Sequence, residues 1–247
     1  MERPVNLAGA SAVVTGGGSG LGLATTTALG RRGAQVVVAD LSPGASEGMH
    51  GVTFVRTDVT SPDEVRAAVR RAAGLAPLRV AVACAGIVHH RRVLGREGVL
   101  DVRDFDQVVR INLTGSAALV VSAAEAMADN SAADEDRGVI VLTASIAAYD
   151  GGSMAYAASK AGVAGMVLPA AQNLAGHAIR VMGIAPGPFE TPMLHGLPPS
   201  LNGFSDGALH PRRPGNPREF AALVEHVVDN PMLNAEVIRL DGGLRMT

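Results

Sequence analysis

Seven short apolar segments rich in valine and isoleucine recur along the chain. They span residues 11–15, 35–40, 52–56, 79–84, 138–144, 179–185 and 236–241. Most of them lack the strict alternation of polar and apolar residues that marks a half-exposed strand, which is typical of strands covered on both faces. We therefore predict about seven strands in a buried sheet.

Segments with a helical spacing of apolar residues lie between most of these strands, at 21–32, 62–74, 105–128, 155–175 and 217–229. Two begin with a capping residue, a proline in the first turn and an acid, as Ser61-Pro62-Asp63-Glu64 and Asn216-Pro217-Arg218-Glu219. For the first of these we expect Glu64 to complete a reciprocal cap. The alternation of strands and helices predicts an α/β fold, a doubly wound parallel sheet of the Rossmann type flanked by helices, with ligands beyond the carboxyl ends of the strands.

Length and apolar content indicate one domain covering residues 1–247. The chain has 247 residues, of which 47% are hydrophobic, and α/β chains of this size commonly form a single domain. Three stretches are predicted to be loops: 87–101, the acidic 129–137, and the proline- and glycine-rich 186–216. A loop as long as the last is often a lid over a site.

Charge and composition exclude several classes of partner. The net charge is -2, and five Phe, two Tyr and no Trp supply few stacking surfaces, so nucleic acid is not expected to bind. The chain starts without a basic segment followed by an apolar one, and no apolar run approaches about 20 residues. We therefore expect a soluble, cytoplasmic protein with no membrane partner.

Metal and hydrolase chemistry are also disfavoured. Cys84 is the single cysteine, which excludes an internal disulfide and a multi-cysteine zinc site. The seven histidines show no ligand spacing, and the adjacent pair His89 and His90 diverges on any regular element. No G-x-S-x-G motif of a serine hydrolase occurs.

A glycine-rich loop, TGGGSGLG at residues 15–22, joins the first predicted strand to the first predicted helix. Glycines at such a junction allow a tight turn and let a pyrophosphate approach backbone N–H groups at the helix start. Asp40 ends the second strand, 18 residues past Gly22. Its carboxylate is placed to accept hydrogen bonds from the adenosine ribose and to repel a 2′-phosphate, which favours NAD over NADP. The alternative is that Asp40 caps the turn before Pro43.

Two further strand ends are candidate cofactor contacts. Asp58 follows the third strand, where it either hydrogen-bonds the adenine amino group or supports the turn before Ser61. Cys84-Ala85-Gly86 closes the fourth strand with small residues that allow close approach of a cofactor. We interpret Cys84 as an inert buried thiol, because no base lies beside it in the sequence.

The basic side chains contain one lysine. Of the 21 Lys and Arg residues, only Lys160 is a lysine, and it follows Tyr156 by four residues on one helical face. A nearby ammonium stabilises a phenolate, whose reference pKa of about 10 is otherwise too high for a base at neutral pH. We predict that Tyr156 transfers a proton to or from a substrate oxygen and that Lys160 assists it. The alternative is an ordinary aromatic beside a solvated lysine.

Two more polar residues belong to this candidate site. Ser145 ends the fifth strand, where it is placed to hydrogen-bond the reacting oxygen; Ser153 is a competing hydroxyl in a Gly-Gly-Ser loop. Asn112 lies inside a predicted helix, although asparagine is a poor helix former, which indicates a contact from its side chain to backbone or water.

Together these residues resemble the classical short-chain dehydrogenase/reductase family over essentially the whole chain. The family's TGxxxGxG motif is matched at Thr15, Gly16, Gly20 and Gly22, and its strand-end NAG at Cys84-Ala85-Gly86, with Cys in place of Asn. Its catalytic Asn, Ser, Tyr and Lys fall on Asn112, Ser145, Tyr156 and Lys160, and its PG motif on Pro186-Gly187, followed by Thr191.

The resemblance implies hydride transfer to or from C4 of a nicotinamide. It makes Tyr156 the acid or base, has Ser145 bind the carbonyl oxygen, has Lys160 also hold the nicotinamide ribose, and has Asn112 sustain a water relay. It implies that the NAD contacts come from Gly16, Ser19, Gly20, Leu21, Gly22, Asp40, Asp58, Val59, Cys84, Ala85, Gly86, Tyr156, Lys160, Pro186, Gly187, Phe189 and Thr191.

Within the family, the segments GVIVLTAS, IRVMGIAPGPFETPML and NPMLNAEVIRLDGGLRM are similar to type 2 3-hydroxyacyl-CoA dehydrogenases, also described as multifunctional 17β-hydroxysteroid dehydrogenases. This implies NAD-dependent interconversion of 3-hydroxyacyl-CoA and 3-oxoacyl-CoA in fatty acid metabolism, by a homotetramer. Ser145 and Tyr156 are eleven residues apart, where the family usually has twelve or thirteen. We expect the shorter loop through Gly151-Gly152-Ser153 to reshape the substrate pocket.

Two other functions remain open from the sequence. A hydroxysteroid or other secondary-alcohol dehydrogenase would use the same catalytic residues, with an apolar pocket from Phe189, Met193, Leu194, Leu197 and Phe204. A non-catalytic NAD-binding scaffold is disfavoured by the complete Ser, Tyr and Lys set. For an acyl-CoA substrate, the loop arginines Arg91, Arg92, Arg212 and Arg213 are candidates to meet the phosphates.

Overall fold

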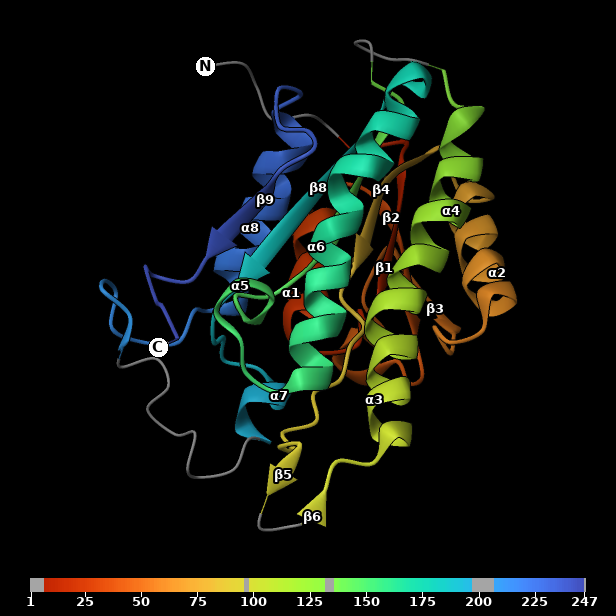
Figure 1. Ribbon diagram of the computed structural model, residues 1–247. Coiled ribbons are helices and arrows are strands. Elements are labelled where there is room, and N and C mark those ends of the chain that lie inside the picture. Colours follow the sequence, from red (N-terminus) through yellow and green to blue (C-terminus); the bar gives the residue numbers. More distant parts are fainter. Residues whose placement is uncertain (1–6, 96–97, 132–135, 197–206, 247) are drawn as a thin grey trace.

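A seven-stranded parallel sheet forms the centre of the computed structural model, which describes residues 7–95, 98–131, 136–196 and 207–246 (Figure 1). Its strands are β1 (Ser11–Thr15), β2 (Gln35–Asp40), β3 (Val52–Arg56), β4 (Leu78–Ala83), β7 (Gly138–Thr143), β8 (Ile179–Pro186) and β9 (Val237–Leu240). Their order is β3-β2-β1-β4-β7-β8-β9, so the direction of winding reverses between β1 and β4. This confirms the predicted doubly wound, Rossmann-type fold in one domain.

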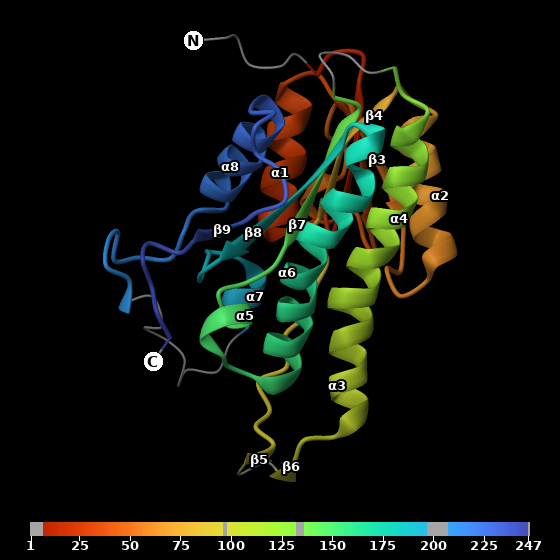
Figure 2. The same cartoon turned by 45° about the horizontal axis from the view of Figure 1, so that its top comes forward.

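Helices cover both faces of the sheet, as Figures 1 and 2 show. One face carries α1 (Gly20–Arg31) and α8 (Pro217–Asp229), which pack on each other. The other carries α2 (Pro62–Ala73), α4 (Gly115–Ala128) and α6 (Met154–Leu174). The five inner strands are buried between two apolar clusters, one on each face, which explains their runs of apolar residues without alternation.

One long helical segment runs over Val102–Ala128, from three residues before the predicted start. It consists of α3 (Val102–Val109), a π-helical turn at Arg110–Thr114 and α4. By length and composition alone this segment is apolar enough to cross a membrane. Here it packs against α2 and α6.

The two predicted helix caps form differently. At α8, the Asn216 side chain accepts from the N–H of Arg218 and Glu219 accepts from the N–H of Asn216, which completes a reciprocal cap. At α2, Ser61 accepts from the N–H of Glu64, but the Glu64 carboxylate accepts from the N–H of Asp58, at 2.9 Å. The reciprocal cap predicted there was therefore wrong, because the loop from β3 offers Glu64 another donor.

The predicted loops contain short elements. Residues 87–101 include the hairpin strands β5 (Leu94–Gly95) and β6 (Gly98–Val99), and 186–216 includes the short helix α7 (Pro192–His195). Between β7 and α6 lies another one-turn helix, α5 (Ala147–Asp150). Residues 132–135 of the acidic loop and 197–206 of the predicted lid lie outside the described residues.

Candidate active site

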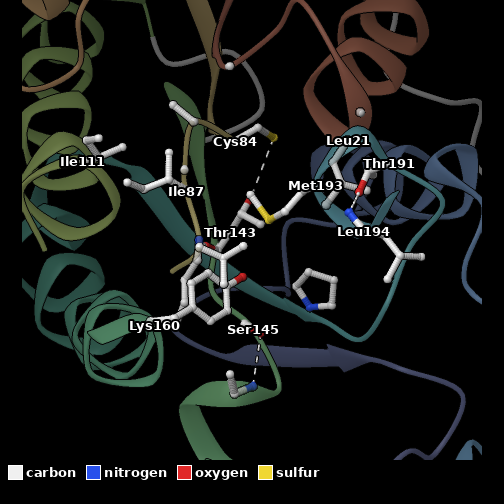
Figure 3. Close-up of a pocket in the computed structure, with 18 of the residues that line it drawn as sticks. Leu21, Cys84, Ile87, Ile111, Thr143, Ser145, Lys160, Thr191, Met193 and Leu194 are labelled. Atoms are coloured by element: carbon white, nitrogen blue, oxygen red, sulfur yellow. Dashed lines mark hydrogen bonds between the residues drawn. The ribbon is translucent and has the colours of Figure 1, made fainter. Parts of the chain in front are cut away.

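A cleft of about 900 Å³ opens at the carboxyl ends of the strands, beside the point where the winding reverses (Figure 3). It is lined by the loops that follow β1, β4, β7 and β8 and by the start of α6. Every candidate catalytic or cofactor-binding residue from the sequence lies on its wall except Asn112. Nucleotides bind at this position in open α/β sheets.

The glycine loop has no room for side chains where the chain turns. Gly16 has a φ of +68°, and a methyl group added to it would lie 2.6 Å from the backbone nitrogen of Ala85. A methyl group at Gly22 would lie 2.1 Å from the carbonyl oxygen of Gly16. The bare backbone thus leads directly into the N-terminus of α1, whose N–H groups suit a pyrophosphate. Thr191 approaches this loop from the other side, because a methyl group at Gly20 would lie 3.2 Å from its Cγ2.

Asp40 performs the turn role and still faces the cleft. One carboxylate oxygen accepts from the N–H of Gly18 at 3.0 Å, and the other accepts from Leu41 at 2.7 Å. Both oxygens therefore have fixed positions at the cleft wall, and each keeps lone pairs for a second donor. The two interpretations of Asp40 are compatible, since a carboxylate held by backbone donors can also meet ribose hydroxyls.

Asp58 and Cys84 also line the cleft. Oδ1 of Asp58 accepts from both the N–H and the hydroxyl of Thr60, and these bonds hold the pKa of the carboxyl below its usual value. Burial raises the pKa of the Cys84 thiol to about 11, and its Sγ lies 3.6 Å from the hydroxyl of Thr143. A thiol with this pKa is protonated at neutral pH, which agrees with the interpretation of Cys84 as inert.

Ser145 and Tyr156 are hydrogen-bonded through their side chains. Ser145 Oγ accepts from the N–H of Ala147 at 3.1 Å, so its own proton remains available for the phenol or for a substrate oxygen. Burial raises the pKa of Tyr156 above its ordinary value of 10.0, and the bond with Ser145 opposes that shift. The phenol is therefore uncharged at neutral pH in this structure.

Lys160 extends from α6 under the same cleft (Figure 3). Its ammonium donates to the carbonyl of Thr143 at 2.7 Å and lies 5.8 Å from the centre of the Tyr156 ring. Burial lowers the pKa of Lys160 to about 8. The lowering of the Tyr156 pKa that we expected from this ammonium does not appear here, because desolvation of the buried phenol dominates. The side chain is buried, which rules out the alternative of a solvated lysine.

Asn112 lies behind the wall of the cleft, in the π-helical turn. Its Oδ1 accepts from the N–H of Ile87 at 2.8 Å, and its Nδ2 donates to the carbonyl of Ile87 and to the hydroxyl of Ser159. The predicted side-chain contact to backbone is confirmed. In this structure Asn112 positions the loop that leads away from Gly86, and its water relay stays a prediction.

The shortened loop between Ser145 and Tyr156 forms part of the substrate wall. Gly151 and Gly152 line it with φ values of +89° and +129°, conformations that favour glycine. Ser153 donates to the carbonyl of His89. This bond supports its assignment to the loop and leaves Ser145 as the hydroxyl beside Tyr156.

The outer cleft is apolar with a basic edge. Phe189, Met193 and Leu194 line it as expected, and the ring of Phe189 packs edge-on against Phe220 with their centres 6.5 Å apart. Leu197 and Phe204 lie outside the described residues. Of the four loop arginines, Arg91 and Arg92 line the cleft, whereas Arg213 pairs with Glu219. Figure 3 shows the side chain of Met193 extending into the cleft toward Thr143 and Lys160.

Sequence reasoning missed three residues of the site. Thr143 binds Lys160 and contacts Cys84, Ser159 holds Asn112, and Met246 lies on the wall of the cleft. Thr143 had a signal, because it is a polar residue in a buried strand two positions before Ser145. Met246 had none, since only the path of the chain after β9 brings it there.

A family model described as "short chain dehydrogenase" matches residues 10–201. The chain belongs to the short-chain dehydrogenase family. It is therefore an oxidoreductase that uses a nicotinamide cofactor on a small-molecule substrate, and the cleft has the bare glycine turn and the free helix N-terminus that such a cofactor requires.

Two relatives and one solved structure show which members of the family this chain is similar to. It is 44% identical to the 3-hydroxyacyl-CoA dehydrogenase type-2 of Drosophila melanogaster, over 96% of this chain and 98% of that protein. It is 36% identical to the cis-4-hydroxycyclohexanecarboxylate dehydrogenase of Sinomonas cyclohexanicum, over 94% and 95% of the two chains. The crystal structure of 3-hydroxyacyl-CoA dehydrogenase type-2 from Mycobacterium avium matches with a TM-score of 0.88 and 40% identity, over 97% of each chain.

Proposed function

We propose that this dehydrogenase interconverts 3-hydroxyacyl-CoA and 3-oxoacyl-CoA with NAD as the hydride carrier. The observation that carries the proposal is the convergence of Ser145, Tyr156 and Lys160 in one cleft with the glycine loop. The full-length similarity to 3-hydroxyacyl-CoA dehydrogenases type-2 supports the choice of substrate.

The residues of the chain supply binding and proton transfer. When bound, the nicotinamide accepts or returns hydride at C4. The Ser145 hydroxyl donates a hydrogen bond to the substrate oxygen and keeps its own proton. Tyr156 takes the proton of the substrate hydroxyl during oxidation or returns it during reduction. Lys160 holds positive charge beside the phenol and stabilises its ionised form relative to a site without that charge.

The preference for NAD rests on Asp40. Its carboxylate is fixed at the cleft wall by the N–H groups of Gly18 and Leu41, where it accepts from ribose hydroxyls. A 2′-phosphate would bring a second negative charge to the same place, which costs binding energy.

The substrate assignment rests on the outer cleft. Met193 and Leu194 form an apolar wall that suits an acyl chain, and Arg91 and Arg92 at its edge suit the phosphates of coenzyme A. Arg91 is held by Asp104 at 3.6 Å, which leaves Arg92 as the less constrained of the pair.

The direct experiment is steady-state oxidation of 3-hydroxybutyryl-CoA with NAD and with NADP in parallel. We expect turnover with a clear preference for NAD. No turnover contradicts the substrate, and a preference for NADP contradicts the role of Asp40.

A secondary-alcohol dehydrogenase of another kind, including one for hydroxysteroids, is the second candidate. It is supported by the similarity to a cis-4-hydroxycyclohexanecarboxylate dehydrogenase and by the apolar wall, which accepts a ring as readily as a chain. Competition between 3-hydroxybutyryl-CoA and cyclic or steroid alcohols in one assay separates the two, because the true substrate suppresses oxidation of the other at lower concentration.

Tyr156→Phe tests whether the chain is catalytic at all. The variant lacks the proton-transfer group, so we expect turnover to fall by a factor of at least about 100. Binding of NADH, followed by its fluorescence, should remain within about threefold, because the cofactor contacts otherwise persist. Unchanged turnover would remove Tyr156 from the mechanism.

We also propose that the enzyme is a homotetramer. Val121 on α4 and Leu168 on α6 expose 61% and 52% of their surface on the outer helices of one face. A subunit contact on this face would cover both side chains.

A further inference from the structure

Arg239 forms a compact ionic cluster beside the active site, on β9. Its two terminal nitrogens donate to the two oxygens of Asp150 at 2.8 and 2.7 Å, and its Nε donates to Asp241 at 2.7 Å. Its guanidinium also lies 5.7 Å from the centre of the Tyr149 ring. The side chains of Arg239 and Asp150 are 22% and 10% exposed, so solvent screens the pair only partly.

Asp150 connects this cluster to the catalytic serine. It is the last residue of α5, a single turn that begins at Ala147, two residues after Ser145. The N–H of Ala147 donates to Ser145 Oγ, and the N–H of Ala148 donates to the Ser145 carbonyl. The N–H of Asp150 donates to Ile146. The turn is therefore held at its end by Arg239 while its start orients the hydroxyl that binds the substrate oxygen.

The same cluster holds the segment that follows β9, residues 241–246. Arg239 donates to the carbonyl of Leu244 at 2.9 Å, and Asp150 accepts from the N–H of Met246 at 3.2 Å. Leu244 is buried in a small apolar cluster with Ile146 and Ala208, and Met246 packs against that cluster. Met246 and Ile146 both line the cleft.

The hydrogen bonds of this cluster require an arginine at position 239 and a carboxylate at position 150. Two parallel bonds to Asp150, one to Asp241 and one to Leu244 use the planar, forked arrangement of guanidinium donors, which an ammonium does not reproduce. Removing either partner leaves a partly buried charge and frees two segments of the cleft wall together.

We propose that Arg239 and Asp150 are positioning residues that set the substrate wall of the cleft and thereby the length of acyl chain it accepts, with Met246 as the side chain that bounds it. The choice of acyl substrates rests on the proposed function. The positioning unit itself rests on the contacts of Arg239 and Asp150.

The test compares Arg239→Lys and Asp150→Asn with the wild-type enzyme on 3-hydroxybutyryl-, 3-hydroxyhexanoyl- and 3-hydroxydecanoyl-CoA. We expect the ratio of kcat/KM between the longest and shortest substrate to change by about tenfold, mainly through KM, because a displaced wall alters the fit of the chain. The Kd of NAD should stay within about twofold, since the glycine loop and Asp40 are untouched.

Arg32→Gln is the matched control. Arg32 is a similarly buried arginine that pairs with Asp229 and joins α1 to α8, and it does not line the cleft. If Arg239→Lys and Asp150→Asn lower all three kcat/KM values by the same factor, as a general loss of stability would, the proposal is wrong. Met246→Ala keeps the ion pair and should raise the relative kcat/KM of the decanoyl substrate, whereas an unchanged ratio removes Met246 from the wall.

A second readout separates this proposal from the proposed function. Hydrogen exchange of residues 241–246, measured by mass spectrometry without substrate, should be slow in the wild type and in Arg32→Gln but faster in Arg239→Lys. If the wild type oxidises no acyl-CoA, the proposed function fails while the exchange result still decides the positioning role. Equal exchange in all three proteins overturns that role whatever the substrate is.

Discussion

At the residue scale, Lys160 lies between the proton-transfer candidate Tyr156 and the strand end at Gly86, where the cofactor is expected to bind. Its ammonium binds the Thr143 carbonyl, lies beside the Tyr156 ring and sits close under Gly86, where an added methyl group would lie 3.7 Å from Nζ. A compact charge fits in this buried space. These contacts explain why a chain with 20 arginines keeps a lysine here.

Lys160→Arg should keep the charge but lose most of the activity. A guanidinium is broader and planar, so it cannot hold the Thr143 carbonyl at 2.7 Å without displacing its neighbours. We expect kcat/KM to fall by about 100-fold or more. Circular dichroism should show an intact fold, and near-normal turnover would contradict the role assigned to this lysine.

The pKa of Lys160 gives a stability prediction with a defined sign. Burial lowers this pKa from 10.5 to about 8, so between these values the unfolded chain binds more protons than the folded one, and alkali favours folding. The free energy of unfolding of the wild type relative to Lys160→Met should therefore rise by up to about 3 kcal/mol between pH 7 and pH 10.5. Urea unfolding of both proteins across this range measures it. A difference that does not change with pH contradicts the shift.

At the element scale, Arg180 closes the end of a helix from a neighbouring strand. Buried on β8, it donates to the carbonyls of Val227 and Leu233 at 2.9 Å and pairs with Asp136 at 2.8 Å. The last carbonyls of a helix have no partners within the helix, so this arginine satisfies acceptors at the end of α8.

Arg180→Leu should lower the free energy of unfolding by about 3 kcal/mol, because it leaves buried carbonyls and a carboxylate without their donor. The site lies away from the cleft, so kcat at 15 °C should change little. Urea unfolding provides the measurement, with Arg103→Leu as control, since the Arg103 side chain is 90% exposed. Equal losses in both variants would contradict the capping role.

At the scale of the whole molecule, the proposed tetramer makes a prediction about the outer helices. Replacing Val121 and Leu168 with glutamate places charge on faces that would be buried between subunits. We expect size-exclusion chromatography with light scattering to give about four times the chain mass of 25.1 kDa for the wild type and a smaller assembly for the double variant. Met232→Glu, at a residue 88% exposed and outside both helices, should leave the wild-type mass unchanged. A monomeric wild type contradicts the proposal.

The sheet and the main helices were predictable because their signals are local. All seven strands begin and end within one residue of their predicted bounds. Each is a short run rich in apolar residues, which the sheet buries on both faces in the five inner strands and half-buries in the edge strands β3 and β9. The start of α3 was missed by three residues, because Asp101 caps Val102–Val109 through the N–H of Arg103 in a stretch with weak apolar spacing.

Sequence alone also predicted the candidate catalytic pair. Tyr156 and Lys160 are four residues apart on one helix, and a helix brings such positions to one face wherever it packs. The positions of the glycine loop and Asp40 were also predictable, because each directly follows or ends a predicted strand and the carboxyl ends of the strands meet at one edge of the sheet.

Only the tertiary structure decided the partners that join distant segments. Asn112 binds Ile87, Glu64 turns to Asp58, and Arg239 meets Asp150 across 89 positions of the chain. The spacing of these residues in the sequence does not predict such contacts. Which donor meets which acceptor depends on how distant segments pack. The order of the strands places the loop after β7 next to the segment after β9. Together these two segments form the wall against which the substrate is expected to fit.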